Sequence, residues 1–155
     1  IAGVTLTGQA DRIDRLADGS LAIVDYKTGK PPSATQVWAG YYLQLGLLGL
    51  IAEQGGFVEV GERQSVSAFE YWSTGKDKGA FGYRKSPVKP GGAEKMIATE
   101  ELTAHAAAHF ARDAGKYLTG DEPFIAKLNP DLPSYGDYDQ LMRLEEWYGR
   151  GDSNG

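Results

Sequence analysis

The spacing of apolar residues predicts two strands near the start of the chain. In residues 3–10 apolar and polar positions alternate, which is the period of two expected of a strand with one buried face. Residues 20–26 hold a nearly continuous apolar run, which favours a central strand of a sheet. A short turn around Asp18-Gly19 separates the two segments. Together they predict a β-hairpin.

A helix is predicted after this hairpin. Gly29-Lys30-Pro31-Pro32 breaks the strand, and Ser33 is a suitable N-cap for a helix that runs to around Gln54. The apolar positions of this segment are dense, as in a helix that packs on a sheet. Gly55-Gly56 then ends it.

The rest of the chain predicts a third strand and a second helix. Residues 65–73 alternate and indicate a strand, while residues 74–95 indicate a loop or an irregular hairpin. A helix is expected to open at Thr99 and to end near Gly120. A helix between the second and third strands implies a crossover connection. We therefore predict an α/β fold with a central mixed β-sheet flanked by helices.

The domain organisation follows from the same pattern. We expect a single domain over residues 1–148, with residues 121–148 forming an extended tail and a short helix, and a disordered tail over residues 149–155. Because the first residue is Ile1 and it stands in a predicted strand, we expect the chain to be a fragment of a longer protein.

Composition excludes several classes of protein. The 155 residues are 41% hydrophobic and 24% charged, as in a globular protein. There is no cysteine, so this chain can hold neither a disulfide nor an iron–sulfur cluster. No apolar run approaches the roughly 20 residues of a membrane span, so no membrane partner is expected. The lack of cysteine is typical of a cytoplasmic protein, and that location is our expectation.

The charge is unevenly distributed. The net charge is −5, but residues 76–95 carry six basic and two acidic residues, a local charge of +4. Such a segment can dock a phosphate backbone even in an acidic protein. A solvated, lysine-rich loop explains the pattern equally well.

Asp11, Asp25 and Lys27 form the main candidate site. Residues i and i+2 of a strand point to the same face, so Asp25 and Lys27 project together, and Asp11 can join them from the neighbouring strand. Mg²⁺ is usually held by one or two carboxylates, water and a substrate phosphate. We expect the backbone carbonyl of Tyr26 to complete the set of protein ligands around the metal ion. A lysine beside such a metal can hold the attacking water or offset charge on the phosphate.

Other polar residues are open to more than one interpretation. Gln44 falls within the predicted first helix, where it can reach the candidate site or a nucleic-acid backbone. Asp14 can be a second metal ligand or the ion-pair partner of an arginine. His105 and His109 are spaced i, i+4 on a helix, which we interpret as a helix face without a metal.

Three segments resemble motifs of the PD-(D/E)XK nuclease superfamily, in its RecB-like branch. They are Gly8-x-Ala10-Asp11-Arg12-Ile13-Asp14, Ile23-Val24-Asp25-Tyr26-Lys27-Thr28-Gly29-Lys30 and Tyr41-x-x-Gln44-Leu45. Two tail segments, Pro123-Phe124-x-Ala126-Lys127 and Tyr135–Trp147, are similar to the AddB subunits of bacterial helicase–nucleases. The chain departs from that branch in having Leu48 at the motif's tyrosine, and no cluster-binding cysteines. We also expect the branch's upstream helix to precede this chain.

The resemblance implies a restriction-endonuclease-like core and a role for each matching residue. Asp11 and Asp25 would hold Mg²⁺, with Mn²⁺ as an alternative ion, Lys27 would be the catalytic lysine, and Gln44 would lie near DNA and the active site. The expected DNA contacts are Lys30, Tyr41, Lys76, Lys78, Arg84 and Lys85.

The function implied is that of a metal-dependent deoxyribonuclease, with exonuclease action as the expectation. It would act in double-strand break repair and recombination beside a helicase–nuclease partner subunit that is AddA-like. Two alternatives stay open. One is an inactive DNA-binding or scaffolding domain that keeps the nuclease fold, and the other is a phosphodiesterase acting on small phosphate esters.

Overall fold

The computed structural model describes residues 1–123, except for the side chain of Ala80. The chain divides into two units, Ile1–Asp121 and Glu122–Gly155, and all the elements below lie in the first. The predictions for residues 124–155, the tail helix included, lie outside the described residues. The elements in chain order are β1 (Arg12–Arg15), β2 (Leu21–Lys27), α1 (Ala34–Trp38), α2 (Gln44–Glu53), β3 (Val66–Asp77), β4 (Ala80–Lys85), the 3₁₀ turn η1 (Thr99–Glu101) and α3 (Leu102–Tyr117).

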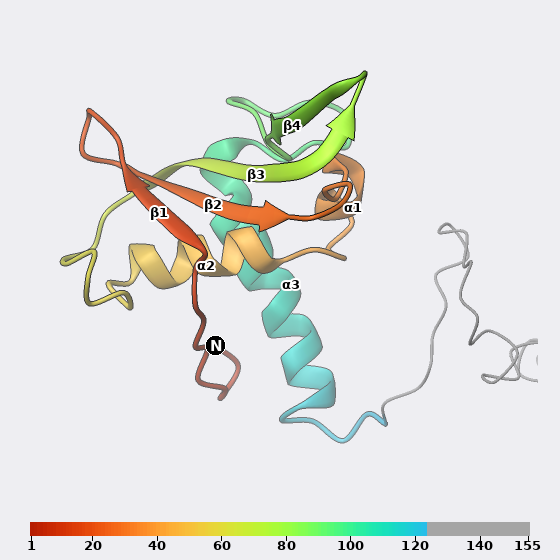
Figure 1. Ribbon diagram of the computed structural model, residues 1–155. Helices are drawn as coiled ribbons and strands as arrows, with labels where there is room; N and C mark the ends of the chain where they lie inside the picture. The colour runs from red at the N-terminus through yellow and green to blue at the C-terminus, as the bar shows by residue number, and fades with distance from the viewer. Residues whose placement is uncertain (124–155) are drawn as a thin grey trace, which may run out of the picture. The chain divides into compact units, whose positions relative to one another are not determined.

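The strands form one sheet in the order β1-β2-β3-β4 (Figure 1). β1 and β2 are antiparallel, β2 and β3 are parallel, and β3 and β4 are antiparallel. α1 and α2 lie in the connection between the two parallel strands, as a crossover requires. α2 packs against β2 and β3, and α3 packs against α2. The predicted mixed sheet with flanking helices is confirmed.

The first strand is not where the alternation of residues 3–10 placed it. β1 covers Arg12–Arg15, and the preceding residues leave the sheet. They run along α2 instead: a methyl group added at Gly8 would lie 3.1 Å from the side chain of Leu48 and 3.2 Å from that of Ile51. The predicted hairpin itself is confirmed, with Arg12 opposite Val24.

The first helix is two helices rather than one. Ser33 is the N-cap of α1, as predicted, and forms a capping box with Gln36. α1 ends at Trp38, and the chain turns at Gly40, whose φ is +83°. A side chain at Gly40 would collide with the ring of His109 on α3. The turn therefore depends on a tertiary contact as well as on the glycine's freedom.

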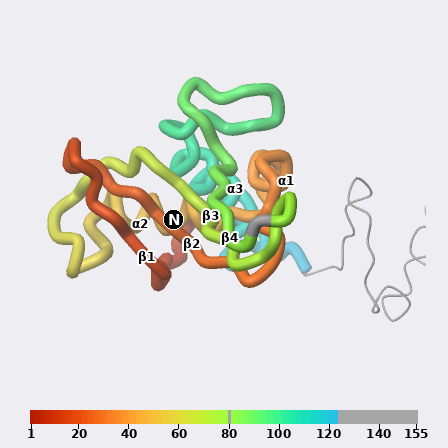
Figure 2. The backbone as a smooth tube through the Cα atoms, turned by 45° about the horizontal axis from the view of Figure 1, so that its top comes forward, coloured from red at the N-terminus to blue at the C-terminus, as the bar shows by residue number. Residues whose placement is uncertain are grey.

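The predicted third strand is confirmed but longer, because β3 continues through Asp77 and pairs with β4. An irregularity between Ser73 and Lys76 bends this hairpin. The predicted second helix is also present, as η1 followed by α3, and it ends at Tyr117. Figure 2 shows the connection over residues 86–98 as a separate loop beyond the sheet.

The core lies between the sheet and α2. It includes Leu21 and Ile23 of β2, Leu45 of α2 and Phe69 of β3, each at most 1% exposed. None of the helices that the structure describes combines the length and the apolar character that a membrane crossing needs.

Candidate functional site

The β1–β2 hairpin brings the two predicted carboxylates to neighbouring positions. Asp11 directly precedes β1, and the register that pairs Arg12 with Val24 places it beside the end of β2. Its Oδ2 accepts a hydrogen bond from the backbone N–H of Tyr26 at 2.9 Å. Asp11 therefore lies against the residue that follows Asp25, and its convergence with the side chains of Asp25 and Lys27 stays a prediction.

Asp25 is a buried carboxylate near the end of β2. The residue is 2% exposed, and Oδ2 lies 2.6 Å from the Nζ of Lys27. Within the described residues this buried oxygen accepts no hydrogen bond of good geometry, so Lys27 contributes charge rather than a directed bond. Buried carboxylate oxygens usually have hydrogen-bond partners, so an unsatisfied one is what a site for an absent ligand would present.

Lys27 connects three elements of the site. Its Nζ contacts Asp25 and donates to Oε1 of Gln44 at 3.2 Å. It also lies 5.7 Å from the centre of the Tyr71 ring, which is within cation–π range. Gln44 is the first residue of α2 rather than a mid-helix residue, because the chain breaks at Gly40. The amide therefore reaches Lys27 from the exposed end of a helix.

Tyr71 of β3 is a site residue that the sequence analysis missed. It pairs with Asp25 in the parallel register and is 1% exposed. Burial raises the pKa of the Tyr71 phenol above its usual range, and the charge of Asp25 and then that of Tyr42 raise it further. The phenol therefore stays protonated beneath Lys27. The alternation of residues 65–73 placed Tyr71 on a strand, but no local pattern reveals which residue faces it.

The donor set fits a magnesium ion. Within residues 1–123, no group of three or more histidine, cysteine or acidic side chains is arranged to hold a metal. The candidate ligands are the carboxylates of Asp11 and Asp25 and the backbone carbonyl of Tyr26. Two carboxylates with water and a substrate phosphate are sufficient for Mg²⁺. Asp14 instead receives both of its bonds from Nε of Arg12, at 2.8 and 2.9 Å, as its structural interpretation expected.

Three of the predicted DNA contacts lie on segments beside the carboxylates, and three lie elsewhere. Lys30 lies in the exposed connection after β2, and Tyr41, which is 47% exposed, lies just before α2. Lys85 pairs with Tyr71 across β3 and β4, so it belongs to the face of the sheet that carries Asp25. These three residues come from segments that border the carboxylates.

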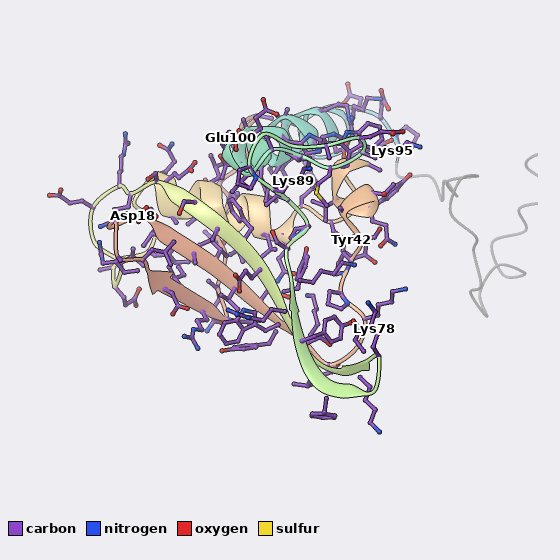
Figure 3. The ribbon with its side chains drawn as sticks, turned by 90° about the horizontal axis from the view of Figure 1, so that it is seen from above. Asp18, Tyr42, Lys78, Lys89, Lys95 and Glu100 are labelled. Carbon is purple, nitrogen blue, oxygen red and sulfur yellow. The ribbon has the colours of Figure 1, made fainter. Side chains whose placement is uncertain are left out.

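The other predicted contacts lie elsewhere. Arg84 pairs with Trp72 and lies over its ring, 5.7 Å from the ring centre, on the opposite face of the sheet from Asp25. Lys76 and Lys78 stand on the β3–β4 hairpin. Figure 3 shows Lys78 well apart from Lys89 and Lys95, so the basic segment over residues 76–95 is not one continuous patch.

Comparison with known proteins identifies the family to which this fold belongs. Residues 1–128 match the family described as the PD-(D/E)XK nuclease superfamily. The matched part contains all the predicted catalytic residues and the whole mixed sheet. No curated protein and no solved structure gave a significant match. With a family match over most of its length and the fold that this family implies, the chain belongs to the PD-(D/E)XK nuclease superfamily.

Proposed function

We propose that this chain is the catalytic domain of a Mg²⁺-dependent DNA nuclease that hydrolyses phosphodiester bonds. Membership of the superfamily indicates a nuclease, and these enzymes generally use divalent metals such as Mg²⁺. The observation that carries the proposal is the buried Oδ2 of Asp25, which accepts no hydrogen bond while an ammonium lies 2.6 Å away. Asp11, Asp25 and the carbonyl of Tyr26 would hold the metal.

The bound ion would supply positive charge to the scissile phosphate and make a water molecule more acidic. The chain's own residues would do the positioning. An ammonium has three N–H donors; Lys27 directs one of them to Gln44 and lies in an ion pair with Asp25. Another N–H of Lys27 can orient a water or bond a phosphate oxygen, where it would stabilise charge that develops during cleavage.

The DNA backbone would pass the mouth of this site. Lys30 and Lys85 come from segments beside the carboxylates, and the hairpin carries Lys76 and Lys78 further out. Lys30, Lys76 and Lys78 are exposed and Lys85 is partly exposed, so their ammonium groups can neutralise successive phosphates. Tyr41 precedes Gln44 by three residues and can contact a sugar or a base.

The biological role of this nuclease is also proposed. We infer exonuclease action in double-strand break repair and recombination, beside a helicase–nuclease partner subunit. The support is the similarity of the chain's motifs and of its residues 123–147 to AddB subunits. The rival is a catalytically inactive DNA-binding or scaffolding domain, and a cleavage assay separates the two.

The test uses the full chain with end-labelled single- and double-stranded DNA, in Mg²⁺, in Mn²⁺ and in chelator. Lys27→Ala should lower cleavage by about 100-fold or more, the scale on which an electrostatic catalytic group acts. Lys89→Ala is the matched control, since it removes a lysine from a loop away from the site. Equal cleavage by the wild type, Lys27→Ala and Lys89→Ala would show that Lys27 is not catalytic. DNA binding without cleavage would favour the scaffold.

A further inference from the structure

The tip of the β3–β4 hairpin carries an aromatic ring that no core contact explains. Phe81 is 75% exposed, more than any other aromatic residue among the described large hydrophobic residues that stand exposed. Figure 1 shows the hairpin extending away from the rest of the sheet at the upper right. A single exposed apolar side chain is common on protein surfaces, so the meaning of this ring depends on the groups that surround it.

The surroundings of Phe81 are basic. Lys76 pairs directly with Phe81 across the two strands, so the two side chains stand on the same side of the ribbon. Lys78 lies in the turn between them, with φ of +48°. Residues 76–85 hold four basic residues and one acid. A ring next to lysines suits a base attached to a phosphate better than it suits an apolar protein surface.

The root of the hairpin is tied to the catalytic segment. Ser73, which is 4% exposed, donates its hydroxyl hydrogen to the carbonyl of Gly29 at 2.7 Å and accepts from the N–H of Gly75 at 2.9 Å. Ser73 also pairs with Lys27 in the parallel register. The hairpin is therefore held in a defined position relative to Lys27.

The distance from this root matches a few nucleotides. Lys76 is three residue steps beyond Ser73 along β3, a span of roughly 10 Å at the usual rise per residue. That is about three steps of a stacked DNA strand, at about 3.4 Å per step. The bulge between these residues bends the tip.

We propose that Phe81 stacks on an unpaired base of the bound DNA, about three nucleotides from the phosphate at Lys27, while Lys76 and Lys78 contact the adjoining phosphates. The inference rests on the proposed function for the identity of the ligand, and it assigns the hairpin a preference for single-stranded segments. Aromatic stacking tolerates every base, so no sequence preference is expected.

The test measures binding in chelator, so that cleavage plays no part. The full chain is titrated with single-stranded oligonucleotides that carry 2-aminopurine at successive positions, and its fluorescence reports stacking. Phe81→Ser should abolish the stacking signal at one or two adjacent positions and weaken binding about 10-fold, while blunt duplex binding stays unchanged. Phe81→Tyr keeps a ring and should restore both. Val58→Ser, at an 88% exposed residue between α2 and β3, is the control.

The outcomes separate the two proposals. If Phe81→Ser binds and stacks like wild type, the stacking role is overturned and the nuclease proposal is untouched. If Phe81→Ser loses the signal but the wild type cuts no DNA in Mg²⁺, the stacking role stands and the nuclease proposal fails. If the wild type binds no DNA, both are overturned. Because Phe81 is exposed, thermal melting should be equal in all variants, and a loss of folding would be detected there.

Discussion

At the scale of single residues, Asp25 is the most constrained group of the site. Its carboxylate is 2% exposed, and its one ion pair among the described residues is with Lys27, whose side chain is 30% exposed. A buried charge is costly unless it is paired and hydrogen-bonded. Each member of this pair should therefore depend on the other.

The first prediction tests that dependence through stability. Lys27→Met should lower the free energy of unfolding by about 1–2 kcal/mol, less than for a fully buried pair because the lysine is partly exposed to solvent. In an Asp25→Asn background the same substitution should cost clearly less, since no charge is left unpaired. Urea unfolding of the four proteins gives the coupling energy. Strictly additive effects would mean that the pair does not stabilise the fold.

The second prediction concerns His109 on α3. Burial, then the nearby His105 and Arg112, lower the pKa of His109, and its Nδ1 contacts a guanidinium nitrogen of Arg112 at 3.1 Å. A guanidinium only donates, so the imidazole is neutral there. In the unfolded chain the histidine gains a proton below about pH 6.5, and stability should fall as the pH drops through that value. His109→Gln should flatten this dependence in urea unfolding between pH 7 and 5, and an unchanged slope would contradict it.

The residues of the candidate site differ in how far the sequence predicts their positions. Asp11, Asp25 and Lys27 follow from the strand period and a short hairpin, which are local properties. Tyr71 could not be found this way, because a long crossover separates β3 from β2 and packing sets their register. Gln44 was predicted as a site candidate, but its place at the start of α2 depends on the break at Gly40.

At the scale of elements, the crossing of α2 and α3 holds the helix that carries Gln44. A methyl group at Gly46 would lie 2.5 Å from the Cβ of Ala106 on α3. One at Gly49 would lie 2.7 Å from the ring of Phe69 on β3 and 2.9 Å from the side chain of Thr103 on α3. The two glycines are one turn apart, so they form a flat strip that lets the helices approach closely.

The third prediction tests this crossing. Gly46→Ala should lower the free energy of unfolding by about 1–3 kcal/mol through overpacking, because the backbone carbonyl of Leu102, 2.9 Å from the added methyl, cannot move aside easily. Gly115→Ala is the control, since nothing lies within 4 Å of a methyl group there and α3 is exposed at that point. That change should stabilise the protein by about 0.5 kcal/mol. Equal effects of the two substitutions would argue against a close crossing.

Element boundaries show where local patterns stop being informative. The apolar residues of Ser33–Gln54 are dense enough for one long helix, and nothing local reveals that His109 occupies the space beside Gly40. Residues 3–10 alternate as a strand does, but they lie outside the sheet, and Gly8 lies beside Leu48 and Ile51 of α2. Both errors arise from contacts between segments far apart in the chain.

At the scale of the whole molecule, an acidic protein can bind DNA only where positive charge is concentrated on one part of its surface. The chain carries a net charge of −5, so DNA binding needs a patch that overcomes the general repulsion. Figure 3 shows Lys78 of the hairpin well apart from Lys89 and Lys95 of the loop beyond β4. The hairpin that carries Lys76 and Lys78 is tied to the segment of Lys27 through the hydrogen bond from Ser73 to Gly29.

The fourth prediction follows from this separation. The double variant Lys76→Ala/Lys78→Ala should weaken single-stranded DNA binding and reduce the slope of log K against log salt by about 1.4, or about 0.7 for each phosphate that is no longer neutralised. The matched double variant Lys89→Ala/Lys95→Ala should leave the slope unchanged. Fluorescence anisotropy at several salt concentrations measures both. If the loop variant changes the slope as much as the hairpin variant, the DNA does not follow the hairpin.

The most direct test of a metal nuclease centred on Asp25 is to count bound Mn²⁺ and to measure DNA cleavage in the same samples. Electron paramagnetic resonance of free Mn²⁺ gives the occupancy of the full chain, of Asp25→Asn and of Asp18→Asn, an exposed acid in the β1–β2 turn. Wild type and Asp18→Asn should bind the ion and cut DNA, and Asp25→Asn should lose both, with cleavage at least about 100-fold slower. If Asp25→Asn binds Mn²⁺ and cuts like wild type, the metal site is not at Asp25 and the account is wrong.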